Sequence, residues 1–199
     1  MRIAKASRAL MQANACGDQS EFWDLNPGWL LCMVDGIGHG ELAEAAALAA
    51  IDYVAAHQLT PFDSLFADCD RVLRPTRGVA MSLIRIDDTG AFEYAGIGNT
   101  QGRLYRADGS KPLRLLGDYG IVGGGYRKLR PQSDSLLPGD LLILFTDGID
   151  DKFDLLGYGP DLLAELPKLA VLMLQDWGRS HDDAALLLYR HQAGTEGLI

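Results

Sequence analysis

The sequence contains few cysteines. There are three in 199 residues, Cys16, Cys32 and Cys69, and they form no CxxC pair. An odd number of widely spaced cysteines does not suit a disulfide framework or a zinc site, and it is typical of free thiols in a reducing compartment. None of them begins a CxxxxxR phosphate-binding loop. We therefore expect a cytoplasmic protein whose thiols are mostly buried and inert.

Long apolar runs and an excess of positive charge are also missing. No stretch approaches the roughly 18 apolar residues of a membrane-spanning helix, and the N-terminal residues lack the apolar centre of a signal peptide. The chain has 18 Lys and Arg against 27 Asp and Glu, a formal net charge of −9. We therefore expect neither nucleic acid nor a membrane surface as a partner. An anionic substrate stays open, because bound divalent cations can reverse the local charge.

The length and composition suit one globular domain. The chain is 48% hydrophobic and 23% charged, and it shows no repeat, low-complexity tract or linker. These values allow a full hydrophobic core and exclude a disordered chain. We expect a single domain over residues 1–191, followed by a C-terminal tail at residues 192–199.

Hydrophobic periodicity predicts both helices and strands. Three- and four-residue spacing predicts helices at residues 41–57, 61–73 and 160–175. Short apolar runs bounded by turn residues predict strands at residues 29–34, 79–86, 91–98, 102–106, 127–133, 141–145 and 184–189. We interpret the three runs between residues 79 and 106 as a β-meander. Many adjacent strands with helices in two places favour an α+β domain with antiparallel sheets.

Aspartates lie at the ends of three apolar strands. "VDGIGHG" places Asp35 after the first run, "LFTDG" places Asp147 after residues 141–145, and "HDDAALLLY" places Asp182 and Asp183 before the last run. Strand ends of one sheet can converge at one edge, and several carboxylates share a site only with a cation. An all-oxygen site suits Mg²⁺ or Mn²⁺, and two such ions about 3.5–4 Å apart can orient a phosphoryl group.

Each motif also has an ordinary interpretation. A single Asp-Gly is more often a turn than a site, and Asp182 with Asp183 can be a solvated strand entry. The glycines at positions 36, 38 and 40 suggest a nucleotide loop, but their spacing is GxGxG where the dinucleotide fingerprint is GxGxxG, and no Walker lysine follows. The three strand-terminal aspartates together are a stronger signal than any one of them.

The order of these motifs resembles a known family. "GD" near the start, then "DGIGHG", "AGIGNT", "LPGDLLILFTDGIDD" and "DDAALLL" are similar to the metal-dependent protein phosphatase 2C superfamily. Within it, the SpoIIE-type branch with its short single-domain stressosome phosphatases is the nearest match. The resemblance covers about residues 4–189. It implies two packed antiparallel β-sheets flanked by helices on both outer faces, an α/β/β/α sandwich.

The resemblance assigns roles to five residues. Asp35 corresponds to the aspartate that bridges two metal ions, and Gly36 to the glycine whose carbonyl binds one of them. Asp147 and Asp182 correspond to ligands of the second metal, and Asp18 in "CGDQ" to an acidic residue that reaches the site through water. The implied cofactor is a pair of Mn²⁺ or Mg²⁺ ions, and the implied catalytic residues are Asp35, Asp147 and Asp182.

The sequence departs from the family pattern in three places. Ile37 stands where the eukaryotic "DGHGG" motif has a histidine assigned as general acid; His39 or water is left for that role. Ala185 stands where the terminal motif often has a threonine hydroxyl. No arginine flanks the early "GD" of Asp18, which leaves the metals and backbone amides to hold phosphate.

The expected function is a metal-dependent phosphoserine/phosphothreonine protein phosphatase that uses a metal-activated water. By the resemblance, its expected partners are phosphorylated STAS-domain proteins of a stressosome-like module. Two alternatives stay open. One is a phosphatase of a small phosphomonoester, which would keep the same carboxylates. The other is a non-catalytic binding module, against which the joint presence of Asp35, Gly36, Asp147 and Asp182 argues.

Overall fold

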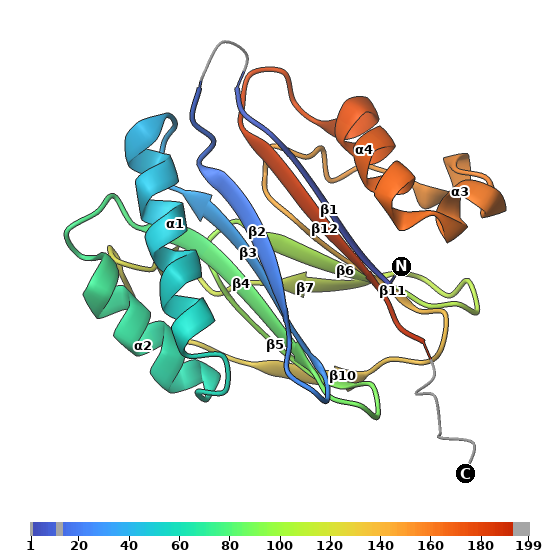
Figure 1. The fold of residues 1–199 in the computed structure, drawn as a ribbon, viewed down its shortest axis with the longest axis horizontal. Helices are drawn as coiled ribbons and strands as arrows, with labels where there is room; N and C mark the ends of the chain where they lie inside the picture. Colours follow the sequence, from blue (N-terminus) through green and yellow to red (C-terminus); the bar gives the residue numbers. More distant parts are fainter. Residues whose placement is uncertain (1, 11–13, 193–199) are drawn as a thin grey trace.

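Two antiparallel sheets lie face to face between two layers of helices in the computed structural model, which describes residues 2–10 and 14–192 (Figure 1). The first sheet has the order β1 (Ile3–Arg8), β12 (Ala184–Arg190), β11 (Leu141–Phe145), β6 (Gln101–Tyr105) and β7 (Leu113–Leu116). The second has the order β10 (Gln132–Ser135), β5 (Ala91–Ile97), β4 (Val79–Ile86), β3 (Trp29–Gly36) and β2 (Asp18–Asp24). A small hairpin joins β8 (Gly120–Ile121) to β9 (Gly125–Tyr126).

Each sheet has its own helical cover. Helices α1 (Glu41–Ala56) and α2 (Phe62–Leu73) pack on the second sheet. The first sheet is covered by α3 (Pro160–Ala164) and α4 (Leu166–Trp177), which follow a short 3₁₀ turn at Leu155–Gly157. This arrangement confirms the expected α/β/β/α sandwich.

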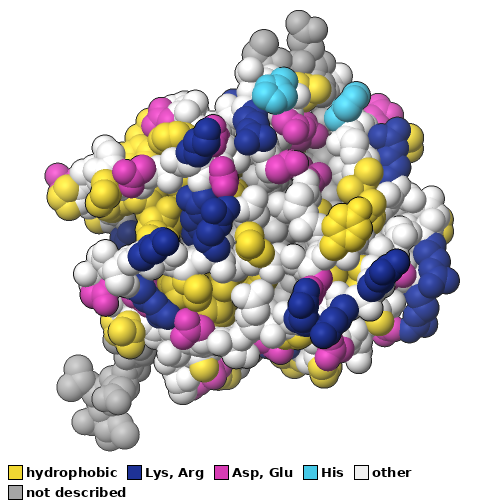
Figure 2. Space-filling view, turned by 180° about the vertical axis from the view of Figure 1, so that it is seen from behind, with side chains coloured by type: hydrophobic (Ala, Val, Ile, Leu, Met, Phe, Trp, Pro, Cys, Tyr) yellow, Lys and Arg dark blue, Asp and Glu magenta, His cyan; other side chains and the backbone are white. Residues whose placement is uncertain are grey.

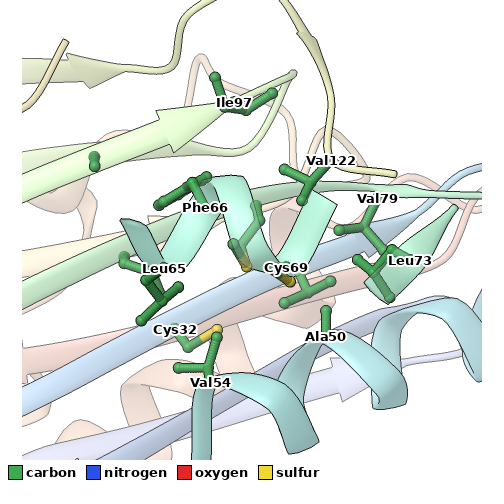
Figure 3. Close-up of a cluster of buried hydrophobic side chains, with 14 of the residues drawn as sticks. Cys32, Ala50, Val54, Leu65, Phe66, Cys69, Leu73, Val79, Ile97 and Val122 are labelled. Carbon is green, nitrogen blue, oxygen red and sulfur yellow. The ribbon is translucent and has the colours of Figure 1, made fainter. Parts of the chain in front are cut away.

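Side-chain alternation along β3 shows how one strand supplies two core layers. Leu31 and Met33 point into the core between the sheets, while Cys32 and Val34 join the core beneath the helices. This is the two-residue period of a strand that is buried on both faces. Figure 3 shows Cys32 among the helix residues Val54 and Cys69, so this thiol fills space in the apolar core.

Helix α1 lies very close to the end of β3. Its buried face consists largely of alanines, at positions 43, 46, 47 and 50. A Cβ on Gly36 would lie 2.1 Å from the carbonyl oxygen of Ala43, so only glycine fits there. The "DG" pair at Asp35 and Gly36 is therefore held where a strand end and a helix N-terminus meet.

Three sequence-based expectations are wrong in detail. The runs at residues 79–106 are not one meander, because β6 crosses to the other sheet and pairs with β11. Periodicity identifies a strand but not its partner. The strand expected at residues 127–133 is observed only from Gln132, since Pro131 lacks an N–H and the Arg130 N–H donates to Asp118. The helix expected at 160–175 breaks at Glu165, just before Pro167 in the first turn of α4.

Two further expectations concern the ends of the chain and the membrane. Within the described residues, no helix is long and apolar enough to cross a bilayer. Most of the expected tail, residues 193–199, lies outside the described part of the chain.

Candidate metal centre

The aspartates singled out in the sequence come from both sheets. Asp18 and Asp35 face each other as paired residues of β2 and β3 in the second sheet. Asp147 follows β11 by two residues, and Asp182 precedes β12 by two residues, in the first sheet. The starts of β2 and β12 lie toward the top of Figure 1, as does the first turn of α1. The strand ends that carry these aspartates lie toward the same end of the molecule, as expected. They belong to two sheets, however, and the sequence-based prediction had placed them on one.

The glycines of the two "DG" motifs are required by close packing. Gly148 would place a Cβ 1.8 Å from the carbonyl oxygen of Asp183, and Gly36 meets Ala43 in the same way. Each glycine therefore lets another backbone segment approach the aspartate that precedes it. The chain turns or bends at both motifs, as the turn interpretation expects, and in each the local backbone positions the carboxylate that the resemblance assigns to the metal site.

Asp18 is the most deeply buried of the four carboxylates. Its residue is 3% exposed, and in the described part of the chain its Oδ2 has no hydrogen-bond partner. Burial raises the pKa of Asp18, and the neighbouring charge of Asp35 raises it further, while a hydrogen bond from Thr146 opposes the shift. An ionised carboxylate left without a partner in this position is costly. This oxygen is therefore placed to bind a cation or water.

Asp35 and Asp147 are coupled through their charges and through an amide. Burial is the largest cause of the raised pKa of Asp35, followed by the charge of Asp147, while a hydrogen bond from Asn99 partly offsets both. The Asn99 Nδ2 also donates to Asp147 Oδ2 at 2.7 Å. Asn99 was not predicted as a site residue. The signal was available, because Asn99 follows the end of β5 as the aspartates follow theirs.

The adjacent Asp182 and Asp183 have different roles. Asp182 is half-buried, and its pKa is raised by burial and then by the charge of Asp147. Asp183 is 2% exposed, and its two oxygens accept the backbone N–H groups of Gly17 at 2.7 Å and Leu10 at 2.6 Å. Asp183 thus ties the segment before β2 to the start of β12, and Asp182 is left to face the other acids.

The residues that departed from the family pattern also have definite positions. Ile37 is half-buried and His39 is exposed at the surface of the same loop. The hydroxyl that Ala185 lacks is supplied nearby, since Thr146 Oγ1 accepts the Ala185 N–H at 3.0 Å. Arg77, which the sequence did not single out, brings Nη1 so close to Gly38 that a Cβ there would lie 2.8 Å from it. A cation therefore lies beside the "DGIGHG" loop.

The thiols do not offer a second route to chemistry. Burial raises the pKa of Cys16 and of Cys69 to about 12. At neutral pH both stay protonated, and a protonated thiol is a poor nucleophile and metal ligand. The expectation of inert thiols is thus supported by their surroundings.

The carboxylates meet the chemical requirements of a divalent hard cation. All donors are oxygen, three of the four aspartates have raised pKa values, and one buried oxygen lacks a partner. A cation would relieve both the mutual repulsion and the missing interaction. Over residues 2–10 and 14–192, however, no three His, Cys, Asp or Glu side chains are drawn together as a formed metal cluster. The oxygen donor set fits Mg²⁺ or Mn²⁺ in its chemistry.

Comparison with known proteins places the chain in a family. The family model described as Stage II sporulation protein E (SpoIIE) matches residues 26–192. The curated protein "Phosphoserine phosphatase RsbX" of Bacillus subtilis (strain 168) is 28% identical over 139 residues, which is 68% of each chain.

Solved structures agree with this fold. One, from work on the bacterial stressosome as a modular system adapted to control secondary messenger signalling, superposes with a TM-score of 0.87 at 32% identity, over 95% of this chain and 98% of the other. Another, RsbX in complex with magnesium, has a TM-score of 0.77 at 22% identity over 95% of each chain. The similarity thus extends through nearly the whole length of the protein.

Proposed function

The chain belongs to the SpoIIE family of PP2C-type serine/threonine phosphatases, and from this premise we propose that it is a two-metal enzyme acting on phosphorylated STAS-domain proteins. The observation that carries the proposal is the meeting of Asp18, Asp35, Asp147 and Asp182 at one end of both sheets. Four carboxylates from separate strands repel one another. This cost would exceed any structural benefit of placing them together, which favours a bound cation as their purpose.

In this proposal Asp35 and the carbonyl of Gly36 would hold one ion, Asp35, Asp147 and Asp182 would hold the second, and Asp18 would act through water. Bound divalent ions would supply an activated water at neutral pH and neutralise charge on the phosphoryl group. Asn99 orients the Asp147 carboxylate through its 2.7 Å hydrogen bond. Asp183 fixes the ends of β2 and β12 through its two backbone acceptor contacts, and so positions Asp182.

The proposed partner class rests on the relatives. One is a structure from stressosome work at 32% identity, and another is the phosphatase RsbX. We propose that this chain acts in the cytoplasm and resets STAS-domain proteins phosphorylated on serine or threonine in a module of that type. The candidate metal centre lies at an open edge of the molecule, which favours recognition of the substrate through a docking surface on a folded partner.

Metal dependence is the first test. Turnover of a chromogenic phosphomonoester should disappear with chelator and return with Mn²⁺ better than with Ca²⁺, which is larger and accepts looser geometry. Unchanged turnover in chelator would exclude the two-metal mechanism.

Substrate class is the second test. A folded phospho-STAS protein should have a much higher kcat/KM than a phosphopeptide cut from it, and also than a free nucleotide. Equal values for protein and peptide would show that the enzyme reads local sequence. A higher value for the nucleotide would indicate a phosphatase of small molecules.

A further inference from the structure

We infer that a groove beside the carboxylates binds an acidic surface of the phosphorylated partner, with Arg127 and Lys128 as its charge-reading residues. This inference rests on the proposed function and specifies the chemistry of the partner. The groove is defined by two adjoining cavities of about 540 Å³ and about 670 Å³, which share Asp118, Tyr119, Gly120 and Gly125.

The groove begins beside the carboxylates of the candidate metal centre. The first cavity is lined by Ile37 of the "DGIGHG" loop and by Asn99, whose amide binds Asp147. The second cavity continues from the shared residues to Arg127 and Lys128. A polypeptide whose phosphate reached the carboxylates would therefore extend along this groove toward the two cations.

The charges along the groove are not balanced at its far end. Asp118 is satisfied by Arg130, which donates both its backbone N–H and its Nε at 2.7 Å. Arg127 and Lys128 are exposed, and within the described residues neither forms a hydrogen bond or an ion pair. In a chain with a formal net charge of −9, two neighbouring cations without partners favour an acidic ligand.

Figure 2 shows this side of the molecule, which is the face opposite to that of Figure 1. Acidic and histidine side chains gather near its upper edge with some Lys and Arg side chains beside them, and further Lys and Arg side chains lie lower on the same face. Cationic side chains are thus available on the same face as the acidic cluster.

The wall of the groove is rigidly attached to the core. Val122 is fully buried between α2 and β4 (Figure 3), and it exchanges two backbone hydrogen bonds of 2.9 Å with Val79. Asp70 of α2 accepts the N–H groups of Gly123 at 2.8 Å and Gly125 at 3.2 Å. The wall is thus formed before binding, which lowers the ordering cost of docking.

Tyr119 gives the groove an aromatic contact. It lines both cavities and is 99% exposed, the highest exposure among the large hydrophobic side chains of the described residues. Tyrosine is enriched at protein interfaces because its ring buries area while its hydroxyl remains hydrated. An exposed tyrosine that lines the same cavity as Arg127 and Lys128, which are unpaired within the described residues, is suited to contact a partner.

Binding of labelled phosphoserine peptides tests the inference without relying on turnover. Three peptides of equal length would carry Asp, Ser or Lys residues several positions away from the phosphoserine, where the far end of the groove would meet them, and fluorescence anisotropy would give Kd for each. We expect the acidic peptide to bind most tightly and to weaken most with added salt. Arg127→Glu and Lys128→Glu should each weaken the acidic peptide about fivefold and leave the neutral one unchanged.

Lys111→Glu is the matched control. Lys111 is exposed, lies outside the groove, and within the described residues has no ion pair, so its reversal should leave all three affinities unchanged. Melting temperatures of the variants should equal that of the wild type. Equal affinity for the three peptides, or equal effects of Lys111→Glu and Lys128→Glu, would overturn the inference.

Turnover separates this inference from the proposed function. The groove variants should hydrolyse the chromogenic phosphomonoester at the wild-type rate with Mn²⁺ and lose kcat/KM only on acidic phosphopeptides. If the wild type hydrolyses neither, the proposed function fails, while the anisotropy measurement still decides whether the groove binds acidic chains.

Discussion

Asp18 and Asp140 each follow a glycine at the start of a strand, yet their buried carboxylates have opposite surroundings. Asp140, after Gly139, is 1% exposed, and it accepts the N–H groups of Ala107 and Leu137 and the guanidinium of Arg106, each at 2.9 Å. Asp18, after Gly17, is 3% exposed and leaves Oδ2 without a partner in the described structure. The carboxylate of Asp140 is fully paired within the protein, whereas Asp18, within the described residues, leaves one oxygen free to bind a cation or water.

The difference shows how a structural carboxylate is told from a functional one. Asp140 precedes β11 and Asp147 follows it, so the same strand has a satisfied acid at one end and a crowded one at the other. Burial alone does not distinguish Asp140 from Asp18, because both are almost fully buried. The hydrogen-bond donors around each oxygen do, because a buried anion is stable only when its lone pairs are used.

The largest expected effect is on catalysis at the crowded end. Asp35→Asn should lower turnover of a chromogenic phosphomonoester with Mn²⁺ by about a thousandfold, because it removes a charge placed to serve both ions. Asp147→Asn and Asp182→Asn should have nearly the same effect. The metal-free melting temperature should stay the same or rise, since repulsion is relieved. Half of the wild-type rate in Asp35→Asn would show that the site assignment is wrong.

The satisfied end should show the reverse pattern. Asp140→Ala should lower the free energy of unfolding by about 3 kcal/mol, because Arg106 and two backbone N–H groups lose a buried acceptor. Turnover per folded molecule should not change, and Mn²⁺ should not restore the lost stability beyond its effect on the wild type. Denaturant unfolding with and without Mn²⁺ measures this. If Asp140→Ala lost turnover while remaining folded, Asp140 would also be functional, and the contrast between the two ends of β11 would be wrong.

Asp183 tests the contrast within the site itself. Asp183→Asn should cost about 2 kcal/mol of stability, since one of its two backbone N–H partners would face an amide N–H₂ group. The effect on turnover should be much milder than that of Asp182→Asn, provided the variant is assayed well below its melting temperature. Equal losses of turnover in the two variants would place Asp183 among the metal ligands.

The contrast also predicts how metal-free stability depends on pH. The pKa of Asp18 is raised from 3.8 to about 8 by burial and by Asp35. The folded protein therefore holds a proton that the unfolded chain has released, so this group's contribution to stability falls as pH rises from about 4 to about 8. Melting temperatures across this range should fall more steeply for the wild type than for Asp18→Asn. Equal slopes would contradict the raised pKa.

Mn²⁺ should act against this trend. Because ion binding favours the ionised carboxylates of the folded state, saturating Mn²⁺ should raise the melting temperature more at pH 8 than at pH 5. A shift that is equal at both values would mean that the ion does not bind at these acids.

Much of the fold was predictable because strong local patterns determine it. The alanine-rich spacing of α1 and the apolar runs of β3 and β11 mark elements whose type and bounds need no tertiary information. Sheet membership was not predictable for β6, because its pairing with β11 joins residues about 40 positions apart in the sequence, and a local pattern does not encode such a partner.

The site was predictable in part for a similar reason. Asp35, Asp147 and Asp182 stand out because each is next to an apolar strand, whereas Asn99 depends on a contact across 48 residues. The different roles of Asp182 and Asp183 are set by the N–H groups of Leu10 and Gly17, which lie far away in the sequence. Motif order therefore predicted the candidate ligands, and the fold was needed to show which neighbouring side chains, such as Asp183, instead hold backbone segments in place.

The most direct test of the metal centre is a titration of the metal-free protein with Mn²⁺, followed by electron paramagnetic resonance of the free ion. The account predicts that the wild type and Asp140→Asn remove Mn²⁺ from solution to the same extent, and that Asp35→Asn removes far less. If Asp35→Asn bound as much Mn²⁺ as the wild type, the carboxylate edge would not be the metal site.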